Sequence, residues 1–172
     1  MFLKFIKDFS LKKIIRKSLA AYKPVANQDV VNTIGILIDE TYFSGKDSLI
    51  KDLAANGFRA ENIQTLSFKD RIKKKEVMDC CHFTRKDIGV DGTFAKEDVA
   101  AFINTPFDML ISYYDVEKAP LVWATLQSKA RFKAGFATVD KKLNHFTINT
   151  VAEKHEEFIA ELIKYLGILN KI

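Results

Sequence analysis

The stretch that most constrains the fold of this chain lies at residues 107–136. It opens with FDMLISYYD, an apolar and aromatic run that carries no charge between Asp108 and Asp115 and is short enough for a buried strand. Pro120 comes next and suits the first turn of a helix, because a backbone N–H would have no partner there. Residues 131–137 (RFKAGFA) then have the pattern of a second strand. A strand, a helix and a strand of these lengths predict a parallel βαβ unit.

A second unit of the same kind precedes it in the chain. Residues 30–39 (VVNTIGILID) are apolar and rich in β-branched side chains, which predicts a strand, and residues 63–68 form the next one. Between them, Ser44 and Asp47 have the spacing of a capping box, which predicts that a helix starts there. Residues 145–149 alternate apolar and polar side chains and predict a further strand.

Strands that alternate with helices predict an α/β protein: a single three-layer, doubly wound, Rossmann-like domain whose sheet is covered on both faces. Thr150 and Glu153 form another capping box ahead of the last predicted helix, and residues 96–104 predict a short helix. Within the remainder of residues 69–105, residues 76–83 could form either a short strand or a short helix, and Gly89 and Gly92 mark a loop. The sheet is expected to be mainly parallel and five-stranded, with the first and central strands adjacent. Its strands are predicted near residues 33–39, 62–68, 107–114, 131–137 and 145–149.

Residues 1–29 are predicted to form a basic amphipathic helical arm in front of an α/β domain at residues 30–172. The apolar residues of the arm lie on two different helix faces, and the change of face falls at Ser10, which could cap a second helix. The first face carries Phe2, Phe5, Ile6 and Phe9, and the second carries Leu11, Ile14, Ile15 and Leu19.

Two hypotheses for the arm stay open at this point. In the first, the arm lies on an anionic membrane surface or in the groove of an unknown protein partner, through its first apolar face and its basic residues. Those basic residues are Lys12, Lys13, Arg16 and Lys17. In the second, the arm docks on its own domain and its lysines face water. The change of face at Ser10 predicts a mixture, with residues 11–19 docked and residues 2–9 more exposed.

The net charge of +5 belongs to the arm. Residues 1–30 contain seven lysines or arginines and two acids, whereas residues 31–172 contain twenty residues of each sign. A nucleic-acid-binding body carries a clustered positive face of its own. We therefore expect no nucleic-acid partner.

The cysteines and the hydropathy of the chain point to the cytoplasm. Two adjacent cysteines, Cys80 and Cys81, do not make a disulfide framework. Lysine or arginine recurs every few positions in the first thirty residues, unlike the apolar core of a secretory signal, and no uncharged run is long enough to span a membrane. Neighbouring cysteines rarely aim both sulfurs at one metal ion. We therefore interpret the pair as small buried thiols and His82 as a surface histidine, and we predict no metal site.

The polar residues most suited to a ligand lie where strands are expected to end. In open parallel sheets, ligands sit beyond the carboxyl ends of the strands, at the point where the strand order reverses. The helix that starts near Ser44 adds backbone N–H groups and a positive dipole end, so a small anionic ligand would fit there. The competing interpretation is that the acids merely end strands and cap loops. The predicted ligand-binding residues are Asp39, Glu40, Thr41, Ser44, Gly45, Lys46, Tyr113, Tyr114 and Asp115.

Two nucleotide-binding motifs do not fit this region. A phosphate-binding loop needs glycine at position 40 and serine or threonine at position 47, where the chain has Glu40 and Asp47. A dinucleotide fingerprint needs closely spaced glycines, but Gly35 lies inside the first strand and the next glycine is Gly45. We therefore expect no cofactor, and the sequence names no catalytic residue.

Several segments of the chain resemble known proteins. They are FDMLISYYD, LVWATLQSKARFKAGF, LNHFTIN, the closing FIAELIKYLGILNKI, and KDIGVDGTF within residues 69–105. Over nearly its full length the chain resembles a small family of uncharacterised bacterial proteins, known as a domain of unknown function. A fainter likeness joins residues 108–136 to one half of heptosyltransferase-type glycosyltransferases, in which an FDxLI strand also leads through a helix to a GF strand end. Those enzymes hold their substrates between two such domains, and this chain supplies one.

The leading hypothesis is a non-enzymatic cytoplasmic α/β domain that binds a partner or a small ligand, held at the inner face of the membrane by its arm. The alternative, which the glycosyltransferase likeness implies, is an enzyme or binding protein for a phosphorylated or nucleotide-linked sugar that acts through Asp39, Lys46 or Asp115. The missing second domain and nucleotide motifs favour the first hypothesis. An open cleft between Asp39 and Asp115 would favour the second.

Overall fold

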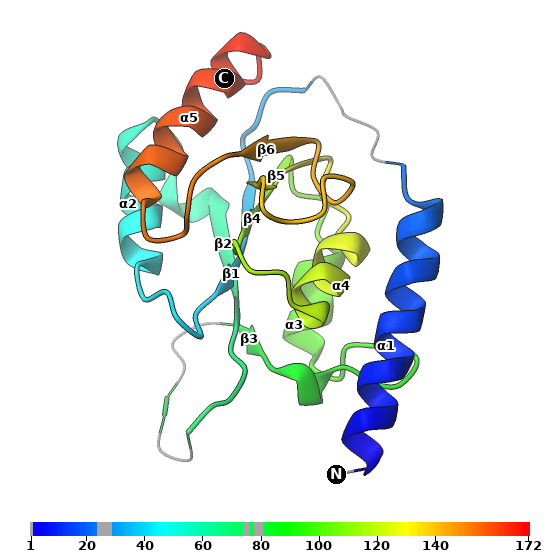
Figure 1. The fold of residues 1–172 in the computed structure, drawn as a ribbon. Helices are drawn as coiled ribbons and strands as arrows, with labels where there is room; N and C mark the ends of the chain where they lie inside the picture. The colour runs from blue at the N-terminus through cyan, green and yellow to red at the C-terminus, as the bar shows by residue number, and fades with distance from the viewer. Residues whose placement is uncertain (1, 24–28, 74–75, 78–80) are drawn as a thin grey trace.

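Figure 1 shows the fold of the chain in a computed structural model. The structure describes residues 2–23, 29–73, 76–77 and 81–172, and it does not describe the side chains of residues 2–5. In chain order the elements are α1 (Phe2–Ala21), β1 (Ile34–Asp39), α2 (Lys46–Ala55), η1 (Ala60–Asn62), β2 (Ile63–Phe68), β3 (His82–Phe83), η2 (Arg85–Asp87), α3 (Glu97–Asn104), β4 (Met109–Tyr113), α4 (Ala119–Gln127), β5 (Phe132–Phe136), β6 (Phe146–Ile148) and α5 (His155–Ile168).

One sheet holds the six described strands in the order β3-β2-β1-β4-β5-β6, and every neighbouring pair is parallel. The prediction of a mainly parallel, Rossmann-like sheet with the first and central strands adjacent is confirmed, since β1 pairs with β4. The predicted number of five strands is wrong, because β3 adds a sixth at the edge. With only two residues, His82 and Phe83, β3 is too short to show an alternating pattern in the sequence.

Helices cover both faces of the sheet (Figure 1). α1, α3 and α4 contribute to the core on one face, and α2 and α5 contribute to the core on the other. α1 packs against α4, and α2 packs against α5. The two central strands, β1 and β4, are buried along their whole length, as expected for parallel strands enclosed on both faces. The chain therefore forms the three layers that the alternation of strands and helices predicts.

Gly35 shows how tightly the central strands are covered. A Cβ atom at this position would lie 2.7 Å from the ring of Phe107 and 3.1 Å from the ring of Phe102. The two rings pack against each other with their centroids 5.0 Å apart. A glycine inside a strand often marks such a close approach. Here it admits the aromatic packing of the segment that leads from α3 to β4.

Within the arm, Phe2–Ala21 form one continuous helix, α1, so the second helix considered at Ser10 does not form. Ser10 keeps its place in the helix and donates a hydrogen bond from its hydroxyl to the backbone oxygen of Val90, at 2.6 Å. The two apolar groups of the arm are therefore two faces of a single rod. The division of the chain into an arm at residues 1–29 and an α/β domain at residues 30–172 stays a prediction.

The two faces of α1 differ in burial. Leu11 and Ile15 are buried in the core that α3 and α4 share. Ile6 and Phe9 are 41% and 67% exposed. The expected division into a docked half and a more exposed half is confirmed for these four residues. The side chains of Phe2 and Phe5, which the same prediction names, lie outside the described part of the chain.

Both predicted capping boxes are wrong. α2 starts directly after Gly45, and Ser44 makes no capping hydrogen bond. Gly45 packs under the ring of Phe43, which a Cβ atom would approach to 2.5 Å, and Gly45 rather than Ser44 takes the N-cap position. α5 starts only after Lys154, and Thr150 is buried in the loop that precedes it. Serine and threonine at the right spacing mark a helix start only where the loop leaves them free to cap.

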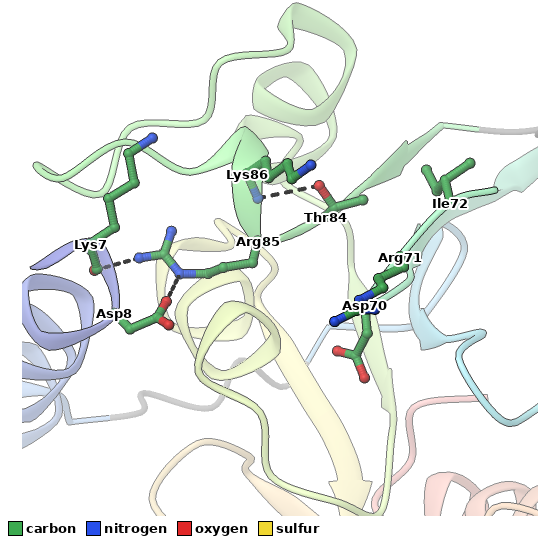
Figure 2. A pocket seen from close by; sticks show the side chains of 8 residues that line it. All are labelled: Lys7, Asp8, Asp70, Arg71, Ile72, Thr84, Arg85 and Lys86. Atoms are coloured by element: carbon green, nitrogen blue, oxygen red, sulfur yellow. Dashed lines mark hydrogen bonds and ion pairs between the residues drawn. The ribbon is translucent and has the colours of Figure 1, made fainter. Parts of the chain in front are cut away.

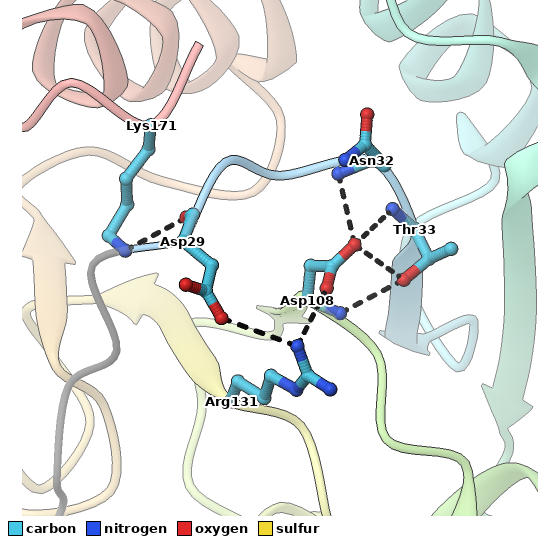
Figure 3. Close-up of polar contacts among 6 residues, drawn as sticks. All are labelled: Asp29, Asn32, Thr33, Asp108, Arg131 and Lys171. Atoms are coloured by element: carbon cyan, nitrogen blue, oxygen red, sulfur yellow. Dashed lines mark hydrogen bonds and ion pairs between the residues drawn. The ribbon is translucent and has the colours of Figure 1, made fainter.

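A polar network fixes the amino-terminal ends of the central strands (Figure 3). The Asp108 carboxylate accepts hydrogen bonds from the backbone N–H groups of Asn32 and Thr33, at 3.1 and 2.9 Å, and from the Thr33 hydroxyl at 2.9 Å. The Arg131 guanidinium lies 3.7 Å from the other carboxylate oxygen. Desolvation works against the charged form of Asp108, but these hydrogen bonds and Arg131 outweigh it and hold its pKa below the usual range.

Asp29 joins the same network to the end of the chain (Figure 3). Arg131 lies 3.4 Å from the Asp29 carboxylate, and the Lys171 ammonium donates to the Asp29 backbone oxygen at 3.4 Å. The backbone N–H of Val31 donates to the Lys171 backbone oxygen at 2.8 Å. The network pins the last residues of the chain against the start of β1, at the end of the sheet opposite to the predicted ligand site.

Candidate functional site

The strand order reverses between β1 and β4, where ligands bind in open parallel sheets. β1 ends at Asp39, β4 ends at Tyr113, and Ile38 pairs with Tyr113 in register. The predicted residues around Asp39 and Asp115 therefore lie together at one end of the sheet. We call the space bounded by Asp39, Tyr113 and Asp115 the switch-point crevice.

Side chains fill the switch-point crevice. The ring of Phe43, from the loop between β1 and α2, lies 5.1 Å from the ring of Tyr113, measured between centroids. Tyr42 from the same loop also lines the crevice. The cavity that remains has a volume of about 30 Å³. That volume holds about one water molecule, so the crevice offers no room for a nucleotide or a sugar.

The two predicted tyrosines point to opposite faces of the sheet, and both hydroxyls are used inside the protein. The Tyr113 hydroxyl donates to the backbone oxygen of Ala152 at 2.7 Å. The Tyr114 hydroxyl lies 2.7 Å from the Thr125 hydroxyl, on the face that α4 covers. Burial raises the pKa of both phenols, and nearby carboxylates add to the effect. Tyr114 therefore lines the crevice, while its hydroxyl is turned toward α4 and away from the other predicted site residues.

Asp39 is neutralised by a lysine that sequence reasoning missed. The Lys118 ammonium lies 2.7 Å from the Asp39 carboxylate and 3.0 Å from the Asp70 carboxylate. It also donates to the Thr41 hydroxyl at 3.1 Å and lies 4.9 Å from the centre of the Tyr42 ring. Burial disfavours the charge of this lysine, but the hydrogen bonds to the two carboxylates outweigh it and raise the Lys118 pKa above its usual value.

The other predicted residues also have partners or cover within the protein. Lys46 lies 3.8 Å from the Glu40 carboxylate, and the Asp115 carboxylate accepts a hydrogen bond from the Ala152 backbone N–H at 2.9 Å. Ser44 is exposed beside this group. The structure thus gathers the predicted residues at one end of the sheet and gives the charged ones partners within the protein. Those it gathers are Asp39, Glu40, Thr41, Ser44, Gly45, Lys46, Tyr113, Tyr114 and Asp115.

A larger cavity lies at the carboxyl ends of β2 and β3, beside the first half of α1 (Figure 2). Its volume is about 770 Å³. Three segments line it: α1, the residues that follow β2, and the turn that follows β3. We call this cavity the basic pocket, because four of its lining residues are basic and two are acidic. They are Lys7, Asp8, Asp70, Arg71, Ile72, Thr84, Arg85 and Lys86.

Arg85 is the fixed centre of the basic pocket (Figure 2). Its guanidinium donates to the Asp8 carboxylate at 2.7 Å and to the backbone oxygen of Ile88 at 3.0 Å. It also donates to the backbone oxygen of Lys7. A capping box that starts at Thr84 holds the turn on which Arg85 lies. Arg85 therefore ties α1 to the end of the sheet.

Sequence reasoning did not find the basic pocket. Its residues come from the arm and from the part of residues 69–105 that showed no regular pattern. One signal was available, because residues 63–68 were predicted as a strand and the strand-end rule applied there points to Asp70 and Arg71. Nothing in the sequence places Lys7 beside Arg71.

Metal-binding residues do not converge in the described part of the chain. No three His, Cys, Asp or Glu side chains there gather as a metal ion would require. Cys80 lies outside the described residues, whereas Cys81 is partly buried against the core and His82 is half-buried in β3. Among the helices that the structure describes, none is long and apolar enough to cross a membrane.

The fold and the site define a class of protein. The sheet is all-parallel, has the 3-2-1-4-5-6 strand order of Rossmann-like folds, and has its switch-point crevice closed by side chains. Residues 7–169 match the family of unknown function DUF6913, and the chain belongs to this family. The resemblance to a domain of unknown function over nearly the full length is thereby confirmed. The chain matches no curated protein and no solved structure.

Proposed function

We propose that this protein is a non-enzymatic binding module that docks on an anionic membrane surface, at the cytoplasmic side, through the outward side of α1. One observation carries the proposal: α1 buries one side in the core and leaves the opposite side apolar in its first half and basic in its second. We call this side the outer face of α1. Its exposed residues are Ile6, Phe9, Lys12, Lys13, Arg16 and Lys17.

Helix geometry explains why the two sides are separate. At about 100° per residue, Phe9, Lys13 and Arg16 fall on the same side of the helix, and Leu11 and Ile15 fall on the opposite side. The second side is fixed because both of its residues are buried in the core. The outer face consequently points away from the body of the protein, where a flat surface can reach all of it.

Charge and hydrophobicity act together on the outer face. Within the described residues, none of its four basic side chains forms an ion pair. A basic residue near an anionic leaflet contributes about 1 kcal/mol to binding, and salt weakens this attraction. Exposed Phe9 and Ile6 add apolar insertion into the interface. A single orientation of α1 on a membrane brings both the basic and the apolar side chains of the outer face against the membrane surface.

The closed switch-point crevice supports a binding role over a catalytic one. Asp39 and Lys46, two of the three residues named for the alternative enzyme function, are paired with Lys118 and Glu40. A sugar-phosphate role has one observation in its favour, which is the basic pocket.

Sedimentation of the full chain with liposomes tests the proposal. We expect binding to vesicles that contain phosphatidylglycerol, weakening as salt is raised, and little binding to phosphatidylcholine alone. Changing Lys12, Lys13, Arg16 and Lys17 to glutamine should abolish this binding. The matched control changes four exposed lysines elsewhere, Lys51, Lys129, Lys141 and Lys142, and removes the same charge.

A second variant separates insertion from attraction. Phe9→Ser removes an exposed ring and leaves every charge in place, so it should weaken binding even at high salt. Equal sedimentation of the outer-face variant and its charge-matched control would contradict the proposal, because it would show that net charge alone drives the association.

A further inference from the structure

The basic pocket has the size and the position of a small-molecule site. Its volume of about 770 Å³ lies within the range of roughly 300–1,000 Å³ for ligand pockets. It lies beyond the carboxyl ends of β2 and β3, at the end of a parallel sheet where ligands bind. The switch-point crevice at the same end has about 30 Å³. A ligand that approaches this end finds far more room beside α1 than between β1 and β4.

Both acids of the basic pocket already have partners. Asp8 lies 2.7 Å from the Arg85 guanidinium, and Asp70 lies 3.0 Å from the Lys118 ammonium. The Lys118 ammonium contributes charge from the neighbouring crevice and is not a lining residue of the pocket. The two carboxylates are therefore occupied and do not neutralise the remaining basic residues.

Three cations of the pocket remain without a carboxylate. Lys7, Arg71 and Lys86 line the cavity from three different segments (Figure 2), and in the part of the chain that the structure describes none of the three forms an ion pair. Like charges that share a cavity repel one another, and an anion bound between them relieves the repulsion. The pocket is consequently suited to a multiply charged anion.

A phosphate group matches this arrangement better than a carboxylate. A phosphate monoester carries close to two negative charges at neutral pH and has three acceptor oxygens, each of which can accept hydrogen bonds from cations. Arg71 offers a planar fork that binds phosphate in a bidentate manner, and the two lysines offer point charges. Ile72 adds an apolar wall, and the cavity is larger than one phosphate, so the ligand also has an organic part.

The pocket is organised before a ligand arrives. Arg85 holds α1 against the turn after β3 through two hydrogen bonds, to Asp8 and Lys7, and a third, to Ile88, fixes it within its own turn. Two of the three segments that carry the cations are therefore joined in advance. Preorganisation of this kind reduces the ordering cost of binding.

We infer that the basic pocket binds a small organic phosphate, a phosphate monoester or a diphosphate, through Lys7, Arg71 and Lys86. The inference does not rest on membrane docking, because none of these three residues belongs to the outer face of α1. The phosphate group can belong to a soluble metabolite or to a lipid headgroup with a terminal phosphate, and both present the same chemistry to the pocket.

Calorimetric titration of the full chain tests the inference with glucose 6-phosphate, inorganic pyrophosphate and, as the uncharged control, glucose. We expect saturable binding of the two phosphorylated probes and none of glucose. Arg71→Gln and Lys86→Gln should each weaken the affinity roughly tenfold, as for a charge-assisted contact to phosphate. Lys129→Gln, an exposed lysine outside the pocket, should leave it unchanged. Unchanged melting temperatures of the three variants show that the fold is intact.

Vesicles distinguish the two sources of the phosphate. Phosphatidic acid presents a phosphate monoester, whereas phosphatidylglycerol presents a diester. Binding of phosphatidic acid vesicles that Arg71→Gln weakens, without binding of the soluble probes, supports the inference with a lipid as the source. Failure of all phosphorylated probes, or equal affinity in the pocket variants and the Lys129 control, overturns it. The outer-face variant should retain glucose 6-phosphate binding, so failure of the membrane proposal leaves this result in place.

Discussion

Two regions at the same end of the sheet, the switch-point crevice and the basic pocket, use their charges in opposite ways. In the crevice, Asp39 and Lys118 lie 2.7 Å apart, aromatic rings pack beside them, and about 30 Å³ is left. In the basic pocket, three cations have no carboxylate partner within the described residues, and about 770 Å³ is open. A place beyond the carboxyl ends of parallel strands therefore does not by itself leave room or free charge for a ligand.

The loop between β1 and α2 explains why the crevice is closed. In dinucleotide-binding sheets this turn is rich in glycine, which lets a phosphate approach the start of the helix. In this chain the turn carries Tyr42 and Phe43, and Phe43 packs against both Tyr113 and His155. Aromatic side chains thus occupy the space that a ligand takes in other sheets of the same strand order.

Tyr113→Ala should give the largest effect, a loss of about 3–5 kcal/mol in the free energy of unfolding, because it removes a fully buried ring. That ring lies 5.1 Å from each of the rings of Phe43, Phe136 and Phe158. Urea denaturation measures the loss. Tyr113→Phe removes only the hydroxyl bonded to Ala152 and should cost about 1 kcal/mol. An alanine variant as stable as the wild type would show that the crevice is not part of the core.

Lys133 gives a further contrast with the paired lysines of the crevice, because it is buried without a carboxylate partner among the described residues. Its ammonium donates to the Thr125 backbone oxygen at 2.6 Å and lies 5.0 Å from the centre of the Tyr22 ring. Burial, with a smaller contribution from Lys129, lowers the Lys133 pKa to about 8. The unfolded chain keeps this proton up to a pKa of about 10.4.

The pH dependence of stability follows from that difference. Between pH 8 and pH 10 the unfolded state binds more protons at this site, so stability should rise with pH. Relative to Lys133→Met, wild-type protein should gain on the order of 2 kcal/mol across this range, measured by denaturation at both values. Parallel pH profiles for the two proteins would show that Lys133 is not desolvated in the folded state.

Asp39→Asn tests the pairing that balances the crevice. It should cost about 2 kcal/mol, because one charge-assisted hydrogen bond to Lys118 is lost while Asp70 still holds that lysine. Replacing Lys118 by methionine in the same variant should recover part of the loss. The reason is that it removes an ammonium group whose nearest carboxylate, that of Asp39, is already gone. If the double variant lost more free energy of unfolding than its two single variants lose together, the pairing of Asp39 with Lys118 would be contradicted.

The smallest effects are expected in the basic pocket. Arg71→Gln and Lys86→Gln should change the free energy of unfolding by no more than about 0.5 kcal/mol, as is usual for exposed residues without a partner. If these residues were structural, their loss would lower the melting temperature by several degrees. A large loss of stability at either position would therefore remove the distinction between the two regions.

The fold was largely predictable because its long, buried strands leave strong patterns. FDMLISYYD, Pro120 and RFKAGFA predict a βαβ unit, and the structure has β4, α4 and β5 there. The failures are local. β3 has only two residues, and α2 is capped by Gly45 under the ring of Phe43, an arrangement that the spacing of Ser44 and Asp47 does not reveal.

The position of the predicted residues at one end of the sheet could be read from the sequence, but the partners of their charged groups could not. The strand-end rule places Asp39 and Asp115 at one end of the sheet, and they lie there. The rule does not reveal that Lys118, which lies between β4 and α4, pairs with Asp39, because that contact joins residues 79 positions apart in the sequence. The basic pocket was missed for the same reason, since Lys7 reaches it from α1 and Arg71 from the residues after β2.

The central claim is that the ligand site at this end of the sheet is the basic pocket and not the crevice. Mapping of backbone amide chemical shifts during a titration with glucose 6-phosphate tests it most directly, because it locates the ligand without any substitution. We predict that the amides of Arg71, Thr84 and Lys86 shift most and that those of Thr41 and Asp115 stay unchanged. The largest shifts at Thr41 and Asp115, with none after β2 and β3, would contradict the account.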